Sequence, residues 1–115
     1  MSKQFTIIKL DKERKLRFAN KSIIFFEEAT GKDFLGEFNK ICEGEMNIKM
    51  INHMLHAGLH AFDKDLTFDE ALDLADESTF TDIMEALTNA IGESYFLTQT
   101  ANSQKVMEEA PKEEK

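Results

Sequence analysis

NIKMINHMLHAGLHAF, residues 47–62, is the stretch around which the chain is organised. At about 100° per residue, a helix here carries apolar side chains over roughly 200° of its circumference, against roughly 100° for an ordinary surface helix. So wide an arc needs neighbours on two sides, and the pattern therefore predicts a central helix. Its apolar positions are Ile48, Ile51, Leu55, Leu59 and Phe62 on one face, with Met50, Met54, Ala57 and Ala61 beside them.

The rest of this helix is polar, and we expect that strip to face solvent or a partner. Its histidines, His53, His56 and His60, share one edge, and side chains at such spacing can form part of a transition-metal site. A further ligand must usually come from elsewhere in the fold. The wet edge of an amphipathic helix explains the same residues, and we therefore predict no metal site. The strip holds Lys49, Asn52, His53, His56, His60 and Asp63.

Short segments rich in β-branched or aromatic residues precede the helices. FTIIKL at 5–10 and KLRFA at 15–19 flank the polar connection DKER at 11–14, which predicts a β-hairpin. Two strands alone are marginally stable in water, so the hairpin must pack against the helices.

Helix start and stop signals divide the remainder. Asn20 is the expected N-cap of a first helix that ends at Gly31, and a second helix runs from about Asp33 to Gly44. Asn47 opens the central helix, with Met46 and Ile51 at the positions of a hydrophobic staple. A capping box of Thr67 and Glu70 predicts the start of a fourth helix. A fifth helix is expected from Ser78 or Thr79 to Phe96 or Leu97.

These elements predict a mainly α fold: a compact bundle of about five helices around the central one, with a short N-terminal β-hairpin at about 5–19. Residues 1–100 are expected to form a single domain, since no linker divides them. Residues 101–115 contain two sizeable apolar residues and the only proline, and are predicted to be a disordered acidic tail.

Charge and composition exclude several classes of function. Residues 1–22 carry a balance of +5 and residues 23–115 a balance of −13. An acidic body repels a phosphate backbone, so nucleic acid is an unfavourable ligand. We expect the basic segment to lie against the acidic body or in water. The chain also lacks the apolar run of a membrane span, and its single cysteine, Cys42, suits a reducing cytosol.

Signals for an enzyme are weak. Cys42 is the one serious nucleophile, but the adjacent Glu43 does not stabilise a thiolate, and a small buried residue is the expected role. DKDLTFDEALDL at 63–74 begins like a calcium loop, yet Phe68 and Leu74 stand where that loop needs glycine and glutamate. We therefore predict neither catalysis nor a cofactor.

The methionine side of the central helix is the candidate partner-binding surface. Methionine is flexible and polarizable, and exposed methionine surfaces accept varied apolar helices. The other interpretation is that this side is buried as the second packing face of a central helix. The candidate binding residues are Met50, Met54, Ala57 and Ala61, with Leu87 and Ile91 from the edge of the last helix.

Over about residues 5–97 the chain resembles the tail assembly chaperones of long-tailed bacteriophages. The segments that carry the resemblance are EEATG at 27–31, AGL at 57–59 and LTFDE at 66–70. The resemblance implies a non-enzymatic protein of the host bacterial cytoplasm, absent from the mature virion. It implies binding to the tape-measure protein, which is kept soluble while tail-tube subunits are recruited. The oligomeric state is left open by the sequence, which also allows a homo-oligomer. The alternative hypothesis is a small helical regulator that responds to metal through His53, His56 and His60.

Overall fold

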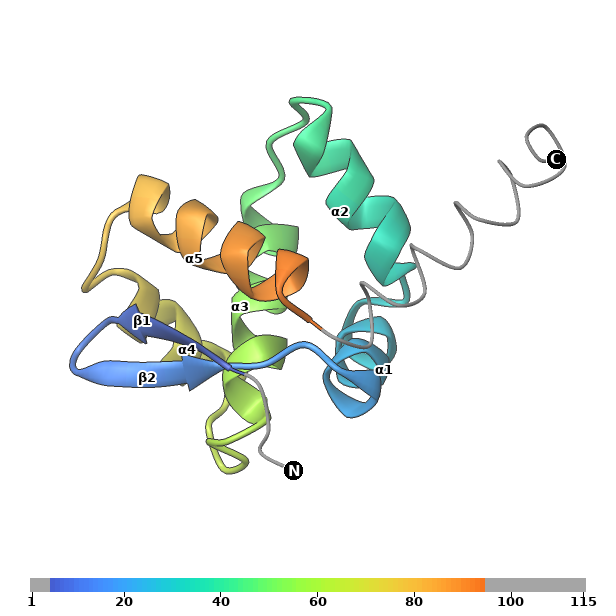
Figure 1. Cartoon of the computed structure of the whole chain (residues 1–115). Coiled ribbons are helices and arrows are strands. Elements are labelled where there is room, and N and C mark those ends of the chain that lie inside the picture. The colour runs from blue at the N-terminus through green and yellow to red at the C-terminus, as the bar shows by residue number, and fades with distance from the viewer. Residues whose placement is uncertain (1–4, 95–115) are drawn as a thin grey trace, which may run out of the picture.

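Five helices and one hairpin make up residues 5–94, the part of the chain that the computed structural model describes (Figure 1). The predicted mainly α fold with a short N-terminal antiparallel hairpin is confirmed. Its elements are β1 (Thr6–Lys9), β2 (Glu13–Leu16), α1 (Asn20–Thr30), α2 (Phe34–Cys42), α3 (Ile48–His60), α4 (Phe68–Ala75) and α5 (Phe80–Gly92).

Helix α3 is the central helix that its wide apolar arc predicts. It contacts α1, α4, α5 and β2, and in Figure 1 it passes through the middle of the fold. Helix α2 packs mainly on α1, where the Phe34 ring lies between those of Phe18 and Phe26. The largest fully buried side chains come from the hairpin region, α1, α2, α3 and α5: Leu16, Phe18, Phe26, Phe34, Ile51, Met54, Leu55, Leu59 and Leu87.

The hairpin pairs Thr6 with Leu16 and Lys9 with Glu13. The second strand therefore begins at Glu13, two residues before the predicted start at 15, and the predicted connection at 11–14 is too long by its last two residues. Polar residues occupy these strand positions because one face of the hairpin is in water, while Ile8 and Leu16 point into the core.

Glycine is required at position 58 because the chain leaving β2 crosses α3 there. The backbone N–H of Arg17 donates a hydrogen bond to the Gly58 carbonyl at 3.1 Å. A Cβ on Gly58 would lie 2.7 Å from Cζ of Phe18 and 2.9 Å from Cδ2 of Leu16. The small-residue step seen in the sequence is thus the point where strand and helix approach most closely.

Side-chain caps begin four of the five helices. The side chains of Asp33, Asn47 and Thr79 each accept a backbone N–H from the first turn, and the predicted capping box of Thr67 and Glu70 makes both of its hydrogen bonds. The prediction for the first helix is wrong by one residue. Ala19 holds the extended N-cap conformation, and no side chain caps α1.

Glycines allow the chain to leave the first two helices. Gly31 ends α1 with φ of 70°, as predicted, and Gly44 follows α2 with φ of 101°, both in the region that favours glycine. Helix α5 ends at Gly92. The predicted later end at Phe96 or Leu97 and the predicted tail at 101–115 lie outside the described residues.

Two predictions about the start of the central helix are wrong. Ile48 was placed on the buried face but is 56% exposed. Met46 is 59% exposed, so its predicted staple with Ile51 does not bury it. Both residues follow α2, which packs mainly on α1, and they lie on the outward side of the turn whose Met50 and Ile51 are buried.

None of the helices among residues 5–94 has the length and apolar character needed to cross a membrane.

Candidate functional site

The predicted methionine ridge lies inside the fold. Met50, Met54 and Ala57 are 6%, 1% and 0% exposed, and Leu87 and Ile91 of α5 are buried in the same core cluster. The structure thus places these residues in one buried core, and Met50, Met54 and Ala57 belong to the buried surface of α3. A partner does not reach them on the surface of the folded protein. Ala61, the sixth candidate, is partly exposed.

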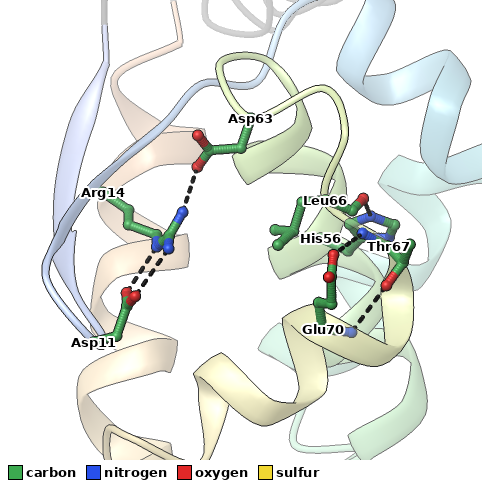
Figure 2. Close-up of polar contacts among 7 residues, drawn as sticks. All are labelled: Asp11, Arg14, His56, Asp63, Leu66, Thr67 and Glu70. Carbon is green, nitrogen blue, oxygen red and sulfur yellow. Dashed lines mark hydrogen bonds and ion pairs between the residues drawn. The ribbon is translucent and has the colours of Figure 1, made fainter.

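The histidines of α3 depart in part from the wet edge that the sequence predicts, because His56 is buried while His53 and His60 are partly exposed. His56 is 6% exposed, and its Nε2–H donates a hydrogen bond to the Leu66 carbonyl at 2.7 Å (Figure 2). A carbonyl oxygen only accepts, so this contact places the hydrogen on Nε2. The bond holds the loop between α3 and α4 against α3, next to the Thr67 capping box.

Phenylalanine rings cover the other two histidines. His53 stacks on Phe68 of α4 and His60 on Phe25 of α1, each with ring centroids 4.0 Å apart. Burial lowers the pKa of both imidazoles from the ordinary value, and neighbouring positive charges lower it further. Those charges are Lys49 and His56 for His53, and His56 and Lys64 for His60. The sequence pattern missed this because α1 and α4 supply the cover.

No group of three or more histidine, cysteine or acidic side chains within residues 5–94 could hold a metal ion. Thr67 of the calcium-like segment caps α4, and Asp63 pairs with Arg14 at 3.0 Å. Arg14 also contacts Asp11 at 2.8 Å, so one guanidinium links the hairpin turn to the end of α3 (Figure 2). The hydrogen bond from Arg14 lowers the pKa of Asp11 to about 2.

Cys42 is exposed, which contradicts its predicted buried role. It lies at the end of α2, and the core-facing side of that helix is taken by Phe34 and Ile41. A nine-residue helix packed mainly on one neighbour buries one narrow face, so positions beside the stripe stay in water.

A groove of about 560 Å³ lies between the start of α1 and the end of α3 and is named here the α1–α3 groove. Ile24, Phe25 and Ala61 give it an apolar floor, and Ala61 is thus the one predicted binding residue that lines it. Its polar rim includes Arg17, Lys21, Lys64, His60 and Glu28.

The rim of the α1–α3 groove is basic although the protein is acidic. Within residues 5–94 the ion pairs are those of Arg14 and Lys40, and the cations of Arg17, Lys21 and Lys64 take part in none of them. Two of these three come from the basic N-terminal segment. The positive balance of that segment could have indicated a basic surface from the sequence. Lys64 lies far from it in the sequence and joins the same rim only in the folded protein.

Comparisons with protein-family models, with curated proteins and with solved structures find no match to this chain.

Proposed function

We propose that this protein is a non-enzymatic tail assembly chaperone of a bacteriophage or prophage, acting in the host bacterial cytoplasm. It binds the tape-measure protein, keeps that protein soluble and helps recruit tail-tube subunits. The proposal starts from the sequence resemblance over about residues 5–97. The observation that supports it is apolar surface left open on an otherwise well-packed acidic domain.

Large apolar side chains are exposed over several elements of residues 5–94. Exposed apolar side chains mark sites of protein association where they lie next to one another, as Met46 and Ile48 do along the chain. The net charge of −8 favours solubility while such surface stays open. These side chains are 40–59% exposed: Phe5, Ile7, Ile24, Leu35, Met46, Ile48 and Phe80.

The metal-responsive alternative loses its support from the described residues. His56 Nε2 is committed to the Leu66 carbonyl, while His53 and His60 stack on rings from different helices. Coordination through His56 Nε2 requires its hydrogen bond to break, and no group of three or more ligating side chains lies together within residues 5–94.

Co-expression with the tape-measure protein of the same phage tests the proposal. We expect the soluble fraction of that client to rise when this chain is present, and the two proteins to co-purify. The double variant Met46→Ser/Ile48→Ser, at two exposed positions, should rescue less client than Thr81→Ser/Thr88→Ser, its control at exposed polar positions. A client that stays insoluble beside the wild-type chain, with nothing co-purifying, contradicts the proposal.

A further inference from the structure

We propose that the α1–α3 groove binds a polypeptide segment with apolar side chains and adjacent carboxylates. The inference deepens the proposed function and rests on it, because it makes this groove one of the surfaces that contact the client, beside the exposed Met46 and Ile48. It departs from the ridge prediction, whose residues are buried.

The floor of the groove suits apolar side chains. Ile24 is 46% exposed although it belongs to a run of four bulky apolar residues in α1, and it lines the groove with Phe25 and Ala61. The volume of about 560 Å³ lies within the range of roughly 300–1,000 Å³ that is typical of ligand pockets. A partner side chain placed on this floor removes apolar surface from water on both molecules.

The rim supplies the charge that selects the partner. Arg17, Lys21 and Lys64 have no carboxylate partner within residues 5–94, and Glu28 is the acidic residue among the lining residues. The stacked rings of Phe25 and His60 both line the groove, and Lys64 is close enough to lower the pKa of His60. A segment with two or three carboxylates therefore complements the rim, whereas a basic segment is repelled.

The charge of the whole protein favours a polypeptide over nucleic acid. Outside residues 1–22 the chain has a balance of −13, so a continuous phosphate backbone leaving the groove meets an acidic body. A peptide carries negative charge only at its acidic side chains, whereas a nucleic acid carries one at every phosphate. Its apolar side chains also use the floor formed by Ile24 and Ala61, which a phosphate backbone does not.

Fluorescence anisotropy of two labelled peptides with the full-length protein tests the inference. Each probe is an amphipathic helical peptide of about 18 residues with a leucine stripe. One carries three glutamates beside the stripe, and its matched partner carries three lysines. We expect the glutamate peptide to bind at least about tenfold more tightly than the lysine peptide, with a difference that shrinks as salt is added.

Charge reversal then places the binding site. Lys21→Glu/Lys64→Glu removes two exposed rim cations and should weaken binding of the glutamate peptide by about tenfold or more. Lys12→Glu/Lys32→Glu makes the same change in net charge at exposed positions outside the groove and should leave binding within about twofold. Circular dichroism of both double variants checks that they stay folded.

Several results overturn the inference: equal weakening by the two double variants, equal affinity for the two peptides, or no binding of either peptide to the wild type. Competition by single-stranded DNA at similar affinity assigns the groove to phosphate instead. Self-association of the wild type that is abolished by Lys21→Glu/Lys64→Glu assigns the groove to a second copy of the chain.

If Lys21→Glu/Lys64→Glu rescues the tape-measure protein as well as wild type, the groove inference fails while the proposed function stands. If wild type rescues no client yet binds the glutamate peptide, the proposed function fails instead.

Discussion

The two ends of α3 carry similar apolar side chains in opposite surroundings. Leu55 and Leu59, in its second half, are fully buried, whereas Ile48 in its first turn is 56% exposed. The second half meets the chain leaving β2 at Gly58, α1 through the ring of Phe25, and the α4 loop through His56. The first turn follows α2, which packs mainly on α1. An apolar residue is therefore buried only where another element reaches it.

Leu55→Ala and Ile48→Ala test this comparison most strongly, because they remove similar side chains from the two ends. Leu55→Ala leaves a cavity and should lower the free energy of unfolding by about 2–5 kcal/mol. Ile48→Ala is its matched control and should change that free energy by less than about 0.5 kcal/mol. Urea unfolding of both variants measures the difference. Similar losses of unfolding free energy in the two variants would contradict the exposure of Ile48.

Gly58→Ala tests the crowded half by adding a single methyl group. The new Cβ meets Phe18 and Leu16, which are 2% and 0% exposed and have little room to move. Overpacking should cost about 1–3 kcal/mol, more than the roughly 0.5–1 kcal/mol that alanine gains over glycine in a helix. In a Leu16→Ala background, Gly58→Ala should lower the free energy of unfolding by less than it does in the wild type, because part of the obstructing side chain is gone. Strict additivity would mean that Leu16 is not the obstacle.

Thr67→Ala tests the loop that joins α3 to α4. It removes the hydroxyl that accepts the Glu70 N–H at 3.1 Å and should cost about 1 kcal/mol of stability. Thr67→Ser keeps an oxygen at the cap and should cost less. Thermal unfolding of the two variants distinguishes them. Equal melting temperatures for Thr67→Ala and wild type would show that the cap does not stabilise α4.

Lowering the pH should produce the smallest effect. The pKa values of His53 and His60 are lowered in the folded state, mainly by burial, so the unfolded chain binds more protons around the ordinary value of 6.5. Stability should therefore fall as the pH drops from about 7.5 to about 5.5, since protonation favours the unfolded state. Asp11, with its pKa lowered to about 2, loses its stabilising contribution only at much lower pH.

His53→Gln/His60→Gln provides the control for that pH dependence. The double variant should show a smaller drop in melting temperature over the same interval, because the two titrating groups are gone. An unchanged drop would assign the dependence to other groups.

Local signals in the sequence predicted much of the fold. The central helix, its N-cap Asn47, the capping box at Thr67 and the left-handed glycine at position 31 each depend on residues within a few positions of one another. Such short-range chemistry is the same in any fold. The hairpin was also predicted, although its second strand begins two residues earlier than expected.

The candidate site was harder to predict because its residues meet only after folding. Arg17 and Lys21 lie 43 or more positions before Lys64, yet all three line one groove, and α1 and α4 bring aromatic rings onto His60 and His53. The periodicity of α3 marks its residues as apolar or polar, but says nothing of what covers each side. That is why both the buried and the partner-binding interpretation of Met50 and Met54 stayed open, and why His56 was predicted to be wet, when all three are buried.

The sequence alone therefore determined the order and type of the elements, the caps at Asn47 and Thr67 and the wide apolar arc of the central helix, because these follow from neighbours along the chain. The tertiary structure alone decided which face of α3 is covered, why position 58 is glycine, and where cations that have no carboxylate partner within residues 5–94 gather around an apolar floor. Those properties depend on the distances between side chains from separate elements, and packing sets these distances.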